Sequence, residues 1–202
     1  MLNTGLSPVY QPTLDRISVF VTDSNGHLYD KYWDGSKWVW EDQGTPVHGG
    51  VFNPSAVYQP TLDRISVFVA GNDGYLYDKY WNVSEWVWED QGTPVHGGVG
   101  MPSAVYQPTL DRISVFVIGE NNGHLYDKYW DGSKWVWEDQ GDPPGIINLS
   151  PGNDTLFYPS AIYQPTLDRI SVFVAGNCGR MCLYDKYWDG SKWVWEDQGT
   201  PY

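Results

Sequence analysis

An arginine, an aspartate and a tryptophan recur four times along the chain at nearly constant spacing. The first copy carries Arg16, Asp30 and Trp38, and the later copies carry Arg64, Asp78 and Trp86; Arg112, Asp127 and Trp135; and Arg169, Asp185 and Trp193. An indole beside charged hydrogen-bonding groups suits a sugar, because the apolar C–H face of the ring stacks on the indole while arginine and aspartate hold the hydroxyls. These residues are the candidate ligand-binding set.

Each member of this set also has a structural interpretation. Arg16 can pair with Asp15, or with an acidic residue of the next repeat, and so hold a loop. Asp30 has the same ambiguity. The three tryptophans of each copy, which in the first are Trp33, Trp38 and Trp40, can all serve packing between repeats. The sequence leaves both interpretations open.

The elements that must position these residues are short strands joined by tight turns. The stretch from Arg16 to Gly44 reads RISVFVTDSNGHLYDKYWDGSKWVWEDQG, and it begins again at Arg64, Arg112 and Arg169. In the first copy we predict strands over 7–11, 17–21, 27–33 and 37–42, because β-branched and aromatic residues alternate there. Asn, Asp and Gly between them mark turns. Residues 1–6 are expected to be a loose lead-in.

Four strands in a repeat of nearly 50 residues predict an all-β fold, a four-bladed β-propeller with four antiparallel strands per blade. We predict one domain over residues 1–202, with repeats at about 7–50, 50–98, 99–141 and 159–202 and a surface loop inserted at 142–158. A single blade cannot bury both faces, so blades must pack on one another. A closed monomer is favoured, and the alternative is a dimer completing eight blades.

The repeated apolar residues are assigned to packing. Ile17, Val19 and Val21 alternate with Ser18 and Phe20 and are predicted to form the core of the blade. Leu28 is also predicted to lie in the core. Tyr10 and Phe20 are predicted to pack between blades.

Charge and composition exclude several classes of partner. The formal net charge is −13, from 25 acidic and 12 basic residues, which argues against nucleic acid and against anionic membrane surfaces. The N-terminus has no secretory signal pattern, which predicts a protein that is cytoplasmic or released without a recognisable signal peptide. Cys178 and Cys182 are close enough in sequence to bridge one enlarged turn, and two free thiols are the alternative.

No metal, cofactor or catalytic centre is predicted. His27, His48, His96 and His124 do not recur in register, which argues against a symmetric metal site. The acidic residues Asp34, Glu41 and Asp42 match no known calcium loop and are expected to form a solvated edge. No Ser, His and Asp set is placed to make a nucleophile, so we predict that the protein is not an enzyme.

The repeat resembles the blades of propeller lectins. The pattern RISVFV, then a glycine turn, LYDKYWDG and WVWEDQG is similar to Photorhabdus-type lectin repeats, and more loosely to Aleuria-type fucose lectins, which carry an arginine at a strand start and an acid before W-D-G. The resemblance implies glycan pockets between neighbouring blades, with fucose or a methylated sugar as ligand. By position it implies that Arg16 and Asp30 hold the hydroxyls. The acid is an Asp where the Aleuria type has Glu.

The sequence therefore supports two functions. The first is a multivalent carbohydrate-binding lectin. The second is a structural or protein-interaction propeller without a sugar ligand, because near-identical copies also fit recent duplication or design from a consensus. A glycan-processing enzyme ranks last.

Overall fold

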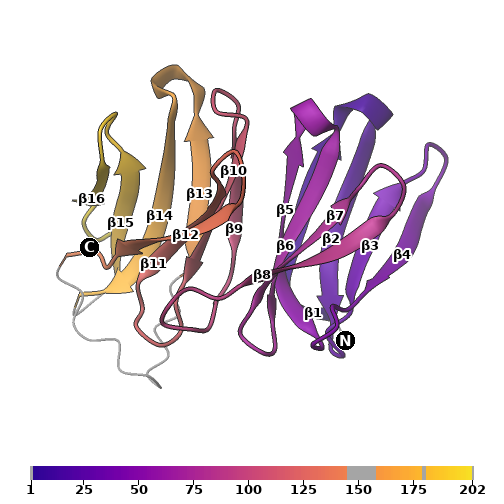
Figure 1. Cartoon of the computed structure of the whole chain (residues 1–202), viewed down its shortest axis with the longest axis horizontal. Helices are drawn as coiled ribbons and strands as arrows, with labels where there is room; N and C mark the ends of the chain where they lie inside the picture. The colour runs from indigo at the N-terminus through magenta and orange to yellow at the C-terminus, as the bar shows by residue number, and fades with distance from the viewer. Residues whose placement is uncertain (1, 145–157, 179–180, 202) are drawn as a thin grey trace. The chain divides into compact units, whose positions relative to one another are not determined.

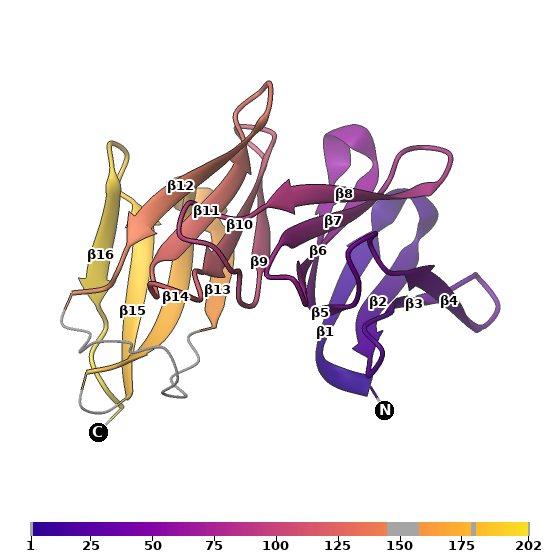
Figure 2. The same cartoon turned by 60° about the horizontal axis from the view of Figure 1, so that its bottom comes forward.

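The computed structural model describes residues 2–144, 158–178 and 181–201, which divide into two compact units, Met1–Thr93 and Pro94–Tyr202. Each unit contains two four-stranded antiparallel sheets, the blades (Figures 1 and 2). The prediction of an all-β protein built from four blades of four antiparallel strands is thereby confirmed. Residues 145–157 of the predicted inserted loop lie outside the described residues, and the single domain over 1–202 stays a prediction.

The first unit contains blades 1 and 2, each running in simple sequence order. Blade 1 consists of β1 (Leu2–Gln11), β2 (Arg16–Asp23), β3 (Leu28–Trp33) and β4 (Trp38–Gly44), and blade 2 of β5 (Val51–Gln59), β6 (Arg64–Gly71), β7 (Leu76–Trp81) and β8 (Trp86–Gly92). The predicted strands of the first repeat are found, but the expected loose lead-in is wrong. The backbone of Leu2 pairs with Asp23 and that of Leu6 with Val21, so β1 begins at Leu2.

The second unit contains blades 3 and 4. Blade 3 consists of β9 (Ser103–Gln107), β10 (Arg112–Ile118), β11 (Leu125–Trp130) and β12 (Trp135–Gly141), and blade 4 of β13 (Pro159–Gln164), β14 (Arg169–Asn177), β15 (Met181–Trp188) and β16 (Trp193–Asp197). The helices among the described residues are single 3-10 turns, Pro12–Leu14, Pro60–Leu62 and Pro165–Leu167. None of the helices in this part of the chain is long and apolar enough to cross a membrane.

A left-handed aspartate links the first and second strands of every blade. Asp15, Asp63, Asp111 and Asp168 have φ angles of 47°, 46°, 47° and 47°. Aspartate tolerates this region better than most residues, because its short side chain can hydrogen-bond locally. The turn places the following arginine at the first position of the second strand.

Strand alternation gives each blade two chemically different faces. In blade 1 the register pairs Ser18 with Tyr32, and Asp30 with both Phe20 and Glu41, so these side chains share one face. We call this the arginine face, and it comprises Arg16, Ser18, Phe20, Asp30, Tyr32 and Glu41. The opposite face is the tryptophan face, and it comprises Ile17, Val19, Val21, Lys31, Trp33, Trp38 and Trp40.

Within the first unit, the arginine face of blade 1 packs on the tryptophan face of blade 2. Phe20 and Leu28 of blade 1 share one buried cluster with Ile65, Val67 and Val69 of blade 2. Strand β5 lies against β1 and β2 (Figure 1). Burial of this apolar surface is the main force that holds the two blades together. The second unit repeats the arrangement, with Phe116 and Leu125 packed on Ile170, Val172 and Val174.

Two of the predicted packing residues are exposed in blade 1. Ile17 is 46% and Tyr10 is 50% exposed, so their assignments to core and inter-blade packing are wrong for this blade. The reason is that the tryptophan face of blade 1 meets no other blade of its own unit. In blade 2 the same position is covered, and Ile65 is only 4% exposed. Phe20 is fully buried, as predicted.

Polar contacts also tie the blades within each unit. The Trp88 indole N–H donates to the Gln43 carbonyl at 3.1 Å, and Trp195 donates to Gln140 at the same distance. The Asp63 carboxylate accepts hydrogen bonds from Gln11 at 3.0 Å and from Thr13 at 2.6 Å, across the blade boundary. Gln107 and Thr109 make the same contacts with Asp168. We call these two sets of contacts the aspartate clasps.

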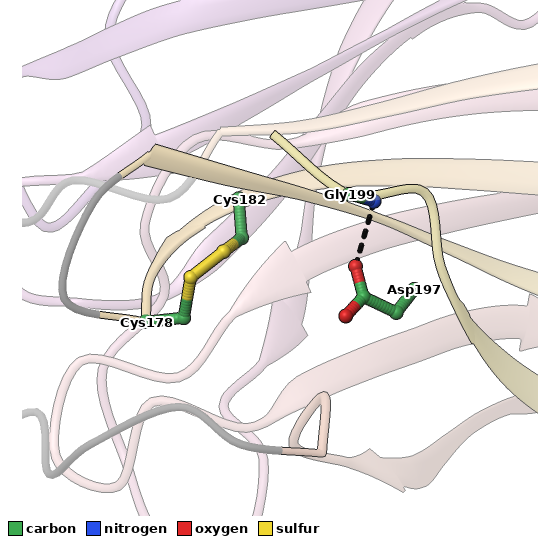
Figure 3. Close-up of a disulfide and its surroundings, with 4 residues drawn as sticks. All are labelled: Cys178, Cys182, Asp197 and Gly199. Atoms are coloured by element: carbon green, nitrogen blue, oxygen red, sulfur yellow. Dashed lines mark hydrogen bonds between the residues drawn. A yellow bond between two sulfur atoms is a disulfide. The ribbon is translucent and has the colours of Figure 1, made fainter. Parts of the chain in front are cut away.

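The hairpin between β14 and β15 is closed by a disulfide between Cys178 and Cys182 (Figure 3). Their Cα atoms lie 6.1 Å apart. In blade 1 a polar cap holds the corresponding turn, where Asp23 accepts backbone N–H bonds from Asn25 and His27. Figure 3 also shows the turn after β16, where Gly199 N–H donates to Asp197 at 2.7 Å. The sequence left bridge and free thiols open, and the structure contains the bridge.

Candidate functional site

A pocket opens at the boundary between blades 1 and 2, within the first unit. It has a volume of about 310 Å³. Blade 1 contributes Gln11, Leu14, Arg16, Tyr32 and Glu41, and blade 2 contributes Ile65, Trp81 and Trp86. The pocket therefore combines part of the arginine face of blade 1 with the indoles of the tryptophan face of blade 2.

Arg16 enters the pocket from the first position of β2. Its Nη2 donates to Asp30 Oδ2 at 2.8 Å, and its guanidinium carbon lies 3.7 Å from the centre of the Tyr32 ring. Nε donates to Ser18 at 3.3 Å. Of the two structural alternatives, the pair between Arg16 and Asp15 is not found, and the Asp15 carboxylate accepts a hydrogen bond from Tyr10. Arg16 is thus held on two sides, and its side chain is 22% exposed.

Asp30 lies beneath Arg16 and does not line the pocket. It is fully buried, and its Oδ2 also accepts a hydrogen bond from Ser18 at 3.1 Å. Burial raises the pKa of Asp30 to about 6, against the opposing effect of Arg16. The counterparts Asp78 and Asp127 are equally enclosed, and burial raises the pKa of Asp78 to about 8 and that of Asp127 to about 7. Burial also raises the pKa of Asp185.

Glu41, which was predicted to lie on a solvated edge, is the acidic residue that lines the pocket. The other two acidic residues of this group, Asp34 and Asp42, accept hydrogen bonds from backbone N–H groups two or three residues later in the chain. Asp34 accepts backbone N–H bonds from Ser36 and Lys37, and Asp42 accepts one from Gly44. The signal that distinguishes Glu41 is its position directly opposite Asp30 on the arginine face.

The tryptophan of the pocket comes from the following blade. Trp86 lines the pocket and meets Phe20 edge-on, with ring centres 5.9 Å apart. Trp38, its counterpart in blade 1, does not line this pocket; it packs against Trp33 and is 45% exposed. Of the predicted set in this unit, Arg16 and Trp86 are therefore brought together, while Trp38 and Arg64 lie outside the pocket.

The second unit repeats the contact between a phenylalanine and the tryptophan of the following blade. Trp193 of blade 4 meets Phe116 of blade 3 edge-on at 5.8 Å, which matches the Phe20–Trp86 contact. Arg112 stands at the start of β10, 4.9 Å from the centre of the Tyr129 ring. Asp127 lies beneath it and accepts a hydrogen bond from Ser114 at 3.3 Å. Trp135 and Arg169 hold the same places in this unit as Trp38 and Arg64 in the first.

The four arginines differ in their contacts although the repeats are nearly identical. Among the residues that the structure describes, Arg16 is the one member of the set with an ion pair. Arg64 donates to the Gln59 side chain at 3.3 Å and lies 4.9 Å from the Tyr80 ring centre. Arg169 lies 4.5 Å from the Tyr187 ring centre. The arginine that contacts its aspartate is also the one that lies closest to its tyrosine.

The pocket can hold a small neutral molecule with both apolar and hydroxyl faces. Trp81, Trp86 and Ile65 offer apolar surface, Arg16 offers N–H donors, and Glu41 offers an acceptor. Within residues 2–144, 158–178 and 181–201, no group of three or more His, Cys, Asp or Glu side chains is arranged to hold a metal ion.

Solved structures similar to this chain include a propeller lectin. AofleA from Arthrobotrys oligospora matches with a TM-score of 0.69 and 16% identity, covering 100% of this chain and 59% of that one. A variant of Aleuria aurantia lectin in complex with Fucα1-6GlcNAc matches with a TM-score of 0.65 and 20% identity, covering 97% and 62%. Another structure of Aleuria aurantia lectin, described as a six-bladed β-propeller, matches with a TM-score of 0.61 and 16% identity, covering 98% and 62%.

These similarities show that the chain has a β-propeller fold. The chain spans about three-fifths of the length of the lectins it matches. No protein-family model matches the sequence, and no curated protein matches it.

Proposed function

We propose that this chain is a non-catalytic lectin that binds fucose or a related methylated sugar in the pocket between blades 1 and 2, and at the equivalent boundary between blades 3 and 4. The observation that carries the proposal is the meeting of Arg16 and Glu41 from one blade with Trp86 from the next. In this arrangement Arg16 donates to ring hydroxyls, Glu41 accepts from them, and the indole covers the apolar face of the sugar.

The similarity to propeller lectins supports the same proposal. One of those structures is a complex with Fucα1-6GlcNAc. Leu14, Ile65 and Trp81 give the pocket of this chain an apolar wall, on which the methyl group of fucose would pack. A second site at the equivalent boundary of blades 3 and 4 would raise the avidity for a surface that displays many glycans, because the second contact is intramolecular.

A glycan array followed by calorimetric titration with methyl α-fucoside tests the proposal. We expect the double variant Trp86→Ala, Trp193→Ala to bind roughly 30-fold more weakly, from the loss of about 2 kcal/mol of apolar contact. The matched control is Trp38→Ala, Trp135→Ala, which removes two tryptophans from the same strand position of blades 1 and 3 and leaves the lining of the pocket between blades 1 and 2 unchanged. No signal for any sugar on the array would refute the lectin function.

The tryptophan face of blade 1 favours a second candidate, a protein-interaction propeller. Ile17, Trp38 and Trp40 on this face are 46%, 45% and 53% exposed, and large exposed apolar side chains in one patch mark interaction sites. A silent glycan array together with a partner captured by the parent chain and lost in Trp38→Ala, Trp40→Ala would favour this function. Ring closure by one chain, against a dimer of eight blades, stays a prediction that mass in solution tests.

A further inference from the structure

Asp30 lies behind Arg16, out of reach of a molecule in the pocket. It is fully buried, and its Oδ2 contacts Arg16 Nη2 and Ser18 Oγ at 2.8 and 3.1 Å. Its Oδ1 is also buried and has no hydrogen-bond partner among the described residues. Burying a carboxylate in this way destabilises the folded chain, and an apolar residue of similar size would destabilise it less. Its position therefore calls for a role that packing does not supply.

The differences among the repeats show what the carboxylate contact does. Arg16, which contacts Asp30, lies 3.7 Å from its tyrosine ring centre. Arg64 lies 4.9 Å from the corresponding centre and donates to Gln59 instead. Arg16, Ser18, Asp30 and Tyr32 have the same residue types at the corresponding positions of blade 2, so the same local residues accommodate two positions of the guanidinium. Contact with the aspartate accompanies the position closer to the tyrosine.

We propose that Asp30 is a positioning residue, which does not touch the ligand and fixes the guanidinium of Arg16 so that its free edge faces the pocket. This inference rests on the proposed sugar-binding function of the same pocket. Three contacts define the orientation of the guanidinium: the Asp30 carboxylate, the Ser18 hydroxyl and the Tyr32 ring. A guanidinium oriented in advance binds a ligand more tightly, because less side-chain freedom is lost on binding.

The role makes the pocket sensitive to acid. Burial raises the pKa of Asp30 to about 6, Arg16 and Ser18 oppose this, and Glu41 on β4 adds to it. From the facing blade, the charged group near this region is Lys79, which interacts with Glu41 and Asp42. Below about pH 6 Asp30 becomes neutral, its attraction for Arg16 weakens, and sugar affinity falls. As the pH rises above about 6, Asp30 ionises and the ion pair with Arg16 becomes stronger.

The test uses the full chain with Arg64→Ala, Arg112→Ala and Arg169→Ala, so that Arg16 is the one arginine left at this position of the repeat. In this parent we expect the affinity for methyl α-fucoside to be about tenfold weaker at pH 5 than at pH 7.5. Adding Asp30→Asn should give the weak affinity at every pH from 5 to 8. The matched control, Asp15→Asn, removes the same charge beside Arg16 in sequence and should follow the parent.

The inference is overturned if Asp30→Asn keeps the affinity of the parent and its pH profile. A readout without ligand separates this failure from failure of the lectin function. The Arg16 Nε–Hε resonance, assigned by its loss in Arg16→Lys, should titrate near pH 6 in the parent and not in Asp30→Asn. Titration without sugar binding refutes the lectin function alone, and a resonance that does not titrate refutes the positioning role. Should Asp30→Asn fail to fold, the titration in the parent decides.

Discussion

The aspartate clasp of the first unit can be measured against an internal control. Asp63 and Asp15 occupy the same left-handed position of the same turn, with φ angles of 46° and 47°. Each accepts a hydrogen bond from the tyrosine five residues earlier, Tyr58 at 2.9 Å and Tyr10 at 2.8 Å. Asp63 accepts two more, from Gln11 and Thr13 of the preceding blade. Replacing each aspartate by glycine therefore isolates the two inter-blade bonds.

The expected difference in the free energy of unfolding follows from the number of hydrogen bonds that each variant loses. Glycine adopts a positive φ without strain and adds the same entropy to both unfolded chains, so these effects cancel between the variants. The tyrosine bond is lost in both. What remains is two partly exposed hydrogen bonds to a carboxylate, each contributing about 0.5–1 kcal/mol. We expect Asp63→Gly to destabilise the first unit by about 1.5 kcal/mol more than Asp15→Gly.

The assay is urea unfolding followed by tryptophan fluorescence. Its pH dependence provides a second check. The hydrogen bonds from Gln11 and Thr13 lower the pKa of Asp63, so the folded chain binds fewer protons than the unfolded chain at moderately acidic pH. The stabilisation is therefore present above the unfolded pKa and is lost as the pH falls through the folded one. Equal destabilisation by the two variants at pH 7 would refute the reasoning.

Three further changes have defined outcomes. Val83 has a φ of 85° and is 85% exposed, where the other blades have Gly35, Gly132 and Gly190, so Val83→Gly should stabilise the first unit by about 1 kcal/mol in urea unfolding; a loss of stability would contradict this. Replacing Cys178 and Cys182 by serine should destabilise the second unit by about 2 kcal/mol, and reductant should do the same to the parent but not to the variant. Burial raises the pKa of Asp78 to about 8. Between about pH 4 and 8 the folded chain therefore binds more protons than the unfolded chain, and the free energy of unfolding falls as the pH rises. The stability advantage of Asp78→Asn over the parent should widen as the pH rises through that window, and a constant difference would contradict the assignment.

Local features of the fold were predictable because they depend on near neighbours in sequence. Alternation in RISVFV and the glycines of the turns predicted the strands, and Phe20 is buried as expected. The exposure of Tyr10 and Ile17 was not predictable, because it depends on whether a second sheet covers the tryptophan face. The same residue types are covered in blade 2, where Ile65 is 4% exposed.

The candidate site was harder to predict, because two of its features depend on packing between blades. Asp30 and Glu41 face each other across β3 and β4, and the sequence does not show which one the neighbouring blade encloses. The structure buries Asp30 and leaves Glu41 in the pocket. Likewise, each repeat carries both an arginine and a tryptophan, but the pocket joins Arg16 to Trp86 of the next repeat.

Under the proposed function, the number of sugar sites depends on how many blade faces pack together and not on the number of copies of the motif. A pocket needs the arginine face of one blade seated on the tryptophan face of another, and each unit contains one such pair, blades 1 and 2 or blades 3 and 4. Copies with the same sequence can then differ in function, as Arg16 and Arg64 already differ in their contacts. Calorimetric stoichiometry should give at least two sugars per chain. A value of one would mean that the match between the Phe20–Trp86 and Phe116–Trp193 contacts does not extend to the ligand.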